Sequence, residues 1–190
     1  MQPKPTLLRR MFGRFIAGPR RFARDDRGVT AVEFGILALP FFTIVFAILE
    51  TAMVFFAGQV LDSAVEDASR LVKTGQGNAY NLGTFRTYMC GYTFNLFDCD
   101  KIRIKVDKIA DFASTTTSQP VWTCQPNGKC DWAVTESFSP GKGREVIQVF
   151  AYYRWPLLVT LPYFNLKNQA DNYRLLGATR VFRNEPFATP

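Results

Sequence analysis

The longest apolar stretch of the chain covers residues 29–58, where Glu33 and Glu50 are the only charged side chains. A helix needs roughly 20 mostly apolar residues to cross a bilayer. The pattern therefore predicts a transmembrane helix over residues 29–58. We expect Pro40 to kink this helix, because proline has no backbone N–H to donate to the preceding turn.

A cleaved secretory signal is the alternative for this stretch. Such a signal has a short apolar region and ends in small residues at the cleavage site. The apolar stretch here is longer, and bulky Phe55 stands near its end where a small residue would be needed. These two features argue against conventional signal cleavage.

Helical periodicity continues beyond the apolar stretch, over residues 59–75. Apolar residues recur there at three- and four-residue spacing, and polar residues occupy the opposite face, which is typical of an amphipathic helix. We expect this extension to continue the span and to end near Gly75 and Gly77, since glycine favours helix termination. The apolar face comprises Val60, Leu61, Ala64, Ala68, Leu71 and Val72, and the polar face comprises Asp62, Ser63, Glu66, Asp67, Arg70 and Lys73.

Residues 76–190 change to a mixed pattern, which predicts a separate folded domain. The expected fold class is α+β: a long N-terminal helix, transmembrane and then amphipathic, packed on a small antiparallel sheet. Pro156 and Pro162 interrupt the apolar run that begins at Val146, so we interpret it as a buried strand followed by an aromatic loop, not as a second span. The elements expected are a short helix over 82–90, strands over 101–107, 145–154 and 175–182, and a polar loop over 114–120.

The net charge of +7 is concentrated in residues 1–28. This leader holds eight basic residues against Asp25 and Asp26, a net charge of +6, which leaves +1 for the rest of the chain. Basic residues that flank a span stay on the cytoplasmic side. We therefore expect a cytoplasmic N-terminus, an inner-membrane span and a periplasmic C-terminal domain. Since the basic residues of the leader are explained by the orientation of the span in the membrane, we expect no nucleic-acid partner.

Four cysteines lie beyond the expected span: Cys90, Cys99, Cys124 and Cys130. Disulfides persist in an oxidising compartment such as the periplasm. Four cysteines allow three pairings, and proximity in sequence favours Cys90–Cys99 and Cys124–Cys130. Zinc is the alternative, but there is neither a C-x-x-C motif nor a histidine to support it, so we expect no metal site.

The chain contains no histidine. Ser-His-Asp and Cys-His mechanisms are therefore excluded, as are metal centres that need histidine ligands. Asp107 and Asp111 are close in sequence, but solvated surface carboxylates are far commoner than catalytic pairs. No glycine-rich phosphate loop is present either. We expect no catalytic residues, no cofactor and no enzymatic activity.

The start of the apolar stretch carries a specific pattern of residues. Gly28 ends the basic leader, Glu33 follows five positions later, and Phe34 comes next. A carboxylate at the edge of a membrane span is costly and needs a reason. The arrangement resembles the processing site of type IV pilins. From Arg21 to about Gln76 the chain resembles the TadE-like proteins, which are minor pilins or pseudopilins of tight-adherence (Flp, type IVc) pilus systems.

The resemblance implies a set of expectations. A prepilin peptidase would cut after Gly28, so that Gly28, Val29, Glu33 and Phe34 form the processing site. The implied function is assembly of an adhesive Flp-type pilus. The implied partners are the prepilin peptidase, other pilins and minor pilins, the inner-membrane assembly platform and membrane lipid. Phe34 stands where major pilins usually carry tyrosine, which suits the minor-pilin branch.

Cleavage after Gly28 would create a charged amine on Val29 at the edge of the membrane. Glu33 of a neighbouring subunit could pair with this amine, and pairing would drive assembly because unpaired charge is costly in lipid. Two other classes stay open at this point. One is an uncleaved single-pass periplasmic scaffold or binding protein of another envelope machine. The other is a membrane-tethered enzyme based on carboxylates, which the missing histidines and site motifs disfavour.

Overall fold

The structure is a computed structural model of the chain. It describes residues 28–116, 120, 122–124, 126, 130–132, 135–158, 165–169 and 172–187. The chain divides into two compact units, Met1–Phe46 and Ala47–Pro190. Among the described residues the main elements are α2 (Val29–Lys73), α3 (Leu82–Gly91), β1 (Arg103–Ile109), β2 (Trp122–Cys124), β3 (Cys130–Trp132), β4 (Ser137–Phe138), β5 (Val146–Pro156) and β6 (Tyr173–Arg183), with short 3-10 turns η2 (Gln76–Ala79), η3 (Cys99–Lys101) and η4 (Phe112–Ser114).

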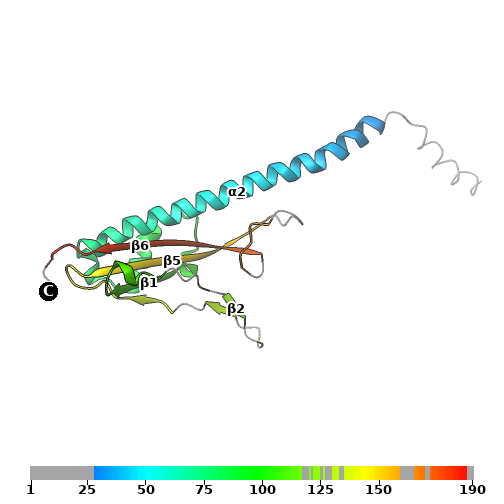
Figure 1. The fold of residues 1–190 in the computed structure, drawn as a ribbon. Helices are drawn as coiled ribbons and strands as arrows, with labels where there is room; N and C mark the ends of the chain where they lie inside the picture. Colours follow the sequence, from blue (N-terminus) through cyan, green and yellow to red (C-terminus); the bar gives the residue numbers. More distant parts are fainter. Residues whose placement is uncertain are drawn as a thin grey trace, which may run out of the picture. The chain divides into compact units, whose positions relative to one another are not determined.

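The main sheet of the second unit has four strands in the order β4-β1-β5-β6. Figure 1 shows β1, β5 and β6 side by side. Strands β1, β5 and β6 pair antiparallel, as expected from the sequence. Strand β4 pairs parallel to β1, so the sheet is mixed and not purely antiparallel. The α+β class is confirmed, and the expected type of sheet is corrected. A separate two-stranded ladder joins β2 and β3.

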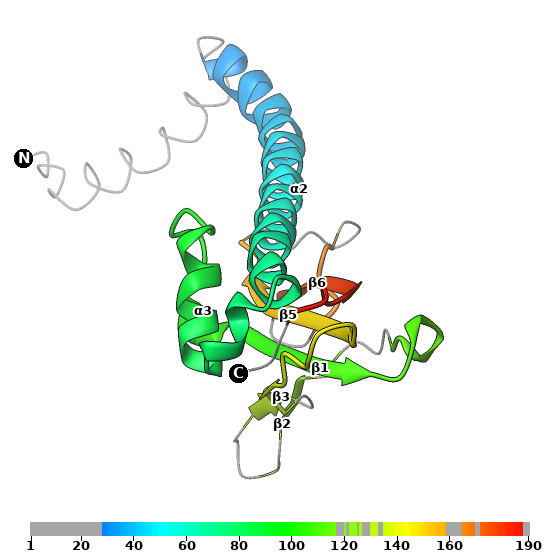
Figure 2. The same ribbon diagram turned by 90° about the vertical axis from the view of Figure 1, so that its left-hand side faces the viewer.

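One face of the main sheet carries the core. Alternate residues of β5, Ile147, Val149, Ala151 and Tyr153, face this core, because successive strand side chains point to opposite faces. The part of α2 after Ala47 covers the same face, and α3 lies beside it (Figure 2). From α2 the buried side chains are Val54, Ala57, Val60, Leu61, Ala64, Val65, Ala68, Ser69 and Val72.

The opposite face of the sheet has a smaller buried cluster formed by Phe150, Tyr152 and Leu175. Next to it, the Gln148 side chain is buried, and its amide Nε2 donates to the backbone carbonyl of Thr116 at 2.7 Å. Gln148 thereby links the chain after η4 to the back of β5. An amide that is buried in this way needs such a partner, since an unpaired polar group costs free energy.

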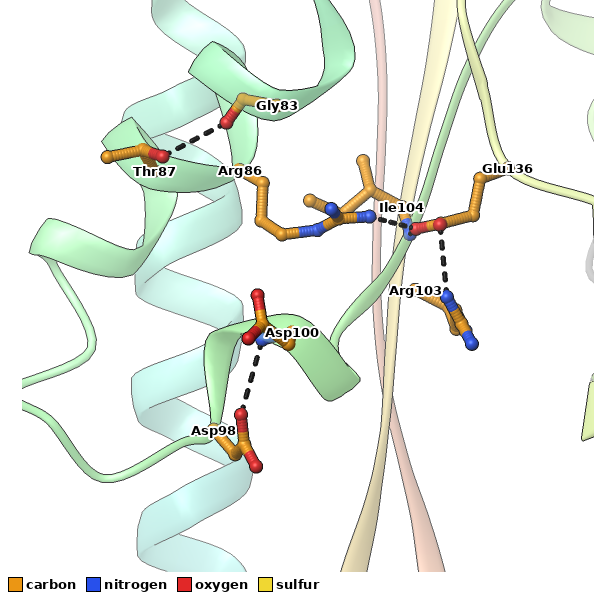
Figure 3. A network of polar contacts seen from close by, with 8 residues as sticks. All are labelled: Gly83, Arg86, Thr87, Asp98, Asp100, Arg103, Ile104 and Glu136. Carbon is orange, nitrogen blue, oxygen red and sulfur yellow. Dashed lines mark hydrogen bonds and ion pairs between the residues drawn. The ribbon is translucent and has the colours of Figure 1, made fainter.

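The short strand β4 is fixed by an ionic network around Glu136 (Figure 3). Glu136 accepts from the guanidinium of Arg86 in α3 at 2.5 Å and from Arg103 in β1 at 3.1 Å. It also accepts from the backbone N–H of Ile104 at 3.1 Å. Burial raises the pKa of the Glu136 carboxyl, but these donors outweigh burial and the net pKa is lowered. One carboxylate therefore ties together α3, β1 and β4.

The end of α2 is closed by the C-terminal segment of the chain. Gly75 follows the helix with a φ of 81°, which is the left-handed conformation that favours glycine after a helix. The backbone N–H of Glu185 donates to the last helical carbonyl, that of Lys73, at 2.9 Å. A Cβ on Gly75 would lie 2.7 Å from the ring of Phe187. The expected stop near the glycines is therefore observed, with a partner that the local pattern did not reveal.

Cys90 and Cys99 form a disulfide, the pairing that their proximity favoured. Cys124 is also disulfide-bonded. In the β2–β3 ladder the backbone of Cys124 lies opposite Cys130. The Cys124–Cys130 pairing stays a prediction, because the side chain of Cys130 lies outside the described part of the structure.

Candidate processing and assembly segment

Gly28 is the first described residue, and α2 begins directly after it at Val29. A side chain built on Gly28 would meet no atom within 4 Å. No packing contact in the described structure therefore requires glycine here. A requirement for glycine at this position would come from a reaction or a partner.

Glu33 lies one helical turn after Val29. Both side chains are exposed, and so is that of Phe34, at 69%. Among the described residues, Glu33 has no hydrogen-bond or ion-pair partner. The structure therefore brings Gly28, Val29, Glu33 and Phe34 together in the first turns of one helix, with a free carboxylate on its surface.

In the described part of the first unit, residues 28–46, no large apolar side chain is buried. A stretch of 18 residues within α2 has a mean hydropathy of 2.3, and none of that stretch is buried. Apolar side chains are exposed on every side of the helix, which is expected for a segment that meets lipid. Among the described residues, α2 is the one helix long and apolar enough to cross a membrane. The large exposed side chains before Ala47 are Val29, Val32, Phe34, Ile36, Leu37, Leu39, Phe41, Phe42, Ile44 and Phe46.

Two threonine hydroxyls within the apolar stretch are satisfied inside the helix. The Thr43 hydroxyl donates to the carbonyl of Leu39 at 2.7 Å, and the Thr51 hydroxyl donates to that of Ala47 at 2.7 Å. Such bonds matter in lipid, where no water replaces a missing partner. The helix is assigned without a break through Pro40, and the kink expected there stays a prediction.

Glu50 has a role that the sequence did not indicate. Glu50 Oε1 accepts from the backbone N–H of Leu158 at 2.5 Å. This contact joins α2 to the chain that follows β5, so Glu50 is part of the folded domain.

Two further carboxylates on the polar face of α2 also make contacts that were not predicted. The guanidinium of Arg180 in β6 donates to both oxygens of Asp62, at 2.8 and 2.6 Å, and also to Glu66. The hydrogen bonds to Asp62 raise the pKa of the Arg180 guanidinium most, and the hydrogen bond to Glu66 raises it further. The signal in the sequence was the spacing of Asp62 and Glu66, one helical turn apart, but their partner is 114 residues or more away in the chain.

Comparison with protein families gives a match that begins at the candidate processing site. Residues 28–70 match the family of TadE-like proteins. Over this segment, called the TadE-like segment below, the chain is similar to the TadE-like proteins. The TadE-like segment contains Gly28, Val29, Glu33 and Phe34, the apolar stretch, and the turns that carry Asp62 and Glu66. Searches of curated proteins and of solved structures gave no match.

Proposed function

We propose that the chain is a minor pilin or pseudopilin that takes part in assembly of a Tad (Flp, type IVc) pilus. The observation that carries the proposal is the coincidence of three features at one point of the chain. The TadE-like segment begins at Gly28, the helix begins at Val29, and exposed apolar side chains follow from there.

The proposed maturation step is hydrolysis of the Gly28–Val29 peptide bond by a prepilin peptidase. Water adds across this bond, which leaves a carboxylate on the leader and an amine on Val29. The open surroundings of Gly28 support access, since a Cβ built on it would meet no atom of the described structure within 4 Å. The basic leader would stay in the cytoplasm, and the domain would face the periplasm.

Assembly is proposed to pair the Val29 amine of one subunit with Glu33 of a neighbour. Glu33 is exposed and lies four residues after Val29, so the pairing requires an axial offset of roughly 6 Å between neighbouring helices at 1.5 Å per residue. Two charges that are costly in lipid would then satisfy each other. Other pilins and the inner-membrane assembly platform are the proposed partners, and no catalytic step is assigned to the chain itself.

Cleavage is tested by co-expression with the prepilin peptidase of the same system. Mass spectrometry should find a chain that has lost residues 1–28 and starts at Val29. Gly28→Ala should be tolerated or cut slowly, whereas Gly28→Leu should block cutting. Gly35→Leu is the matched control, because a Cβ built on Gly35 also meets nothing within 4 Å. An intact leader in cells with an active peptidase would favour the uncleaved scaffold.

Assembly is tested by counting surface pili in a deletion strain that expresses each variant at matched level. Glu33→Ala and Glu33→Gln should insert and fold, yet fail in piliation, because the charge is lost. Glu50→Gln is the control, since its amide oxygen still accepts from the Leu158 N–H. Wild-type piliation with Glu33→Ala would contradict the proposed charge pairing.

A further inference from the structure

Two apolar side chains outside α2 are exposed to an unusual degree. Leu158 is 91% exposed and Phe94 is 85% exposed. Burying a leucine or phenylalanine is strongly favourable. Two such side chains that are exposed and also held in place therefore indicate a surface that another molecule covers. Both belong to the second unit, which makes their positions directly comparable.

Leu158 is held by its neighbours although its own side chain is exposed. Its backbone N–H donates to Glu50 Oε1. The preceding residue, Leu157, is buried, and its N–H and carbonyl both bond to Asn172, at 3.1 and 2.7 Å. The exposed side chain therefore sits at a fixed position beside α2.

Phe94 is presented by a loop that is anchored at both ends. The Cys90–Cys99 disulfide closes this loop. Thr93 is buried, and its hydroxyl donates to the carbonyl of Cys90 at 2.8 Å. Phe94 itself has a φ of 53°, the left-handed conformation that is uncommon for such a residue.

The loop of Phe94 lies at the same end of the sheet as Leu158. The ring of Phe97, three residues after Phe94, is buried and lies 4.8 Å from that of Tyr153 and 5.8 Å from that of Trp155. Both rings belong to the last residues of β5, and Leu158 follows directly after this strand. The loop and Leu158 therefore share one edge of the domain.

Cations accompany the apolar side chains at this edge. The Arg154 guanidinium lies 4.1 Å from the ring centroid of Tyr173. Arg174 lies opposite Trp155 in the ladder and donates to the carbonyl of Leu166 at 2.7 Å. Exposed apolar and aromatic residues together with arginines are typical of surfaces at a membrane interface.

The sequence of α2 indicates what meets this edge. Residues 29–49 measure about 31 Å as a helix, which matches the hydrocarbon thickness of about 30 Å. Glu50 is the first charge after Glu33, so a helix that crosses the bilayer leaves it near Glu50. Leu158 is bonded to that residue.

We propose that this edge, with Leu158 and Phe94 at its surface, inserts into the headgroup region of the bilayer that α2 spans. The occupant is lipid with anionic headgroups, which the arginines of the edge complement. This inference rests on the proposed membrane anchoring. It adds a second attachment, which orients the periplasmic domain against the membrane before assembly.

The test uses the full chain in vesicles of phosphatidylethanolamine and phosphatidylglycerol, with the photocrosslinker benzoylphenylalanine replacing one residue at a time. The test positions are Leu158 and Phe94. Phe112 is the matched control, because it is also exposed (53%) but follows the end of β1 that pairs with the start of β5. It therefore lies at the end of the sheet opposite to Leu158. Phe42 is the control for the span itself. Each adduct is identified by mass spectrometry.

Lipid adducts at Leu158 and Phe94 should exceed those at Phe112 by about tenfold, given the preference of such side chains for an apolar phase. Lipid adducts at Phe42 without any at Leu158 and Phe94 would overturn this inference and leave membrane anchoring intact. Protein adducts at Leu158 and Phe94 would overturn it in favour of a subunit interface. No lipid adduct at Phe42 would reject the anchoring itself.

Discussion

The two parts of α2, before and after the boundary at Phe46 and Ala47, are surrounded differently. The first part exposes its large apolar side chains on every side. The second part has a buried stripe at helical spacing, in which Ala57, Ala64 and Ala68 are fully buried. The second part is therefore stabilised by packing on the sheet, whereas the first part presents side chains that suit an apolar surrounding such as lipid.

Side-chain size explains part of the difference. Alanine on the buried stripe lets the helix backbone approach the sheet closely, whereas the first part is rich in phenylalanine and leucine. The second part also has ionic contacts to the sheet, through Asp62 and Glu66 to Arg180. In the described residues of the first part, Glu33 has no such contact. The contrast predicts that equal substitutions will have unequal effects in the two parts.

The largest effect is expected from arginine introduced into each part. Ala64→Arg should unfold the domain, because Ala64 is fully buried and the substitution adds both volume and an unpaired charge, at a cost of more than about 4 kcal/mol. Leu37→Arg should leave the domain folded but impair insertion, by about 3 kcal/mol at the centre of a span. Proteolysis and membrane fractionation separate the two outcomes. If Leu37→Arg unfolded the domain, the two parts would not be independent.

A smaller effect is expected for Glu136→Ala, which breaks the network that holds β4 to β1. Arg86 and Arg103 would lose their carboxylate, at a cost of about 2–3 kcal/mol for a partly buried site. Chemical denaturation in detergent measures this cost. Insertion of α2 should not change, because the network lies wholly in the domain.

Glu136 should also make the stability of the domain depend on pH. The pKa of the Glu136 carboxyl is lowered in the folded protein, so its contribution is fully present above the unfolded pKa of about 4.3 and is lost as pH falls through the lower folded pKa. Wild-type stability should therefore decrease more steeply in this acidic range than that of Glu136→Gln. Parallel acid slopes would contradict this role.

The smallest effect is expected at the end of the second part, for Gly75→Ala. The substituted residue would have to keep a left-handed backbone conformation, and its new Cβ would meet the Phe187 ring. We therefore expect the free energy of unfolding to fall by about 1–2 kcal/mol. Gly91→Ala is the control, because Gly91 ends α3 with nothing within 4 Å. Thermal unfolding should show a lower midpoint for Gly75→Ala alone. Equal midpoints would mean that the C-terminal segment does not restrain the helix end.

The local pattern predicted the elements well where periodicity was long. The stretch over 29–75 became α2, ending at Lys73. The strands predicted over 101–107, 145–154 and 175–182 became β1, β5 and β6, and each strand terminus is shifted by one or two residues. The candidate processing residues come from the sequence alone, because Gly28 and Glu33 stand out against an apolar background, and their role stays a prediction. Strand β4 was not predicted, since its two residues carry no pattern.

The sequence by itself therefore determined the helix, its apolar and amphipathic parts, and the residues at Gly28 and Glu33, because these depend on spacing along one segment. The tertiary structure decided which distant groups meet: Arg180 with Asp62, Leu158 with Glu50, and Glu136 with Ile104. A charged or polar side chain on an exposed face has many possible partners in sequence. Only the packing of α2 and α3 on the sheet brings one of them within hydrogen-bonding distance.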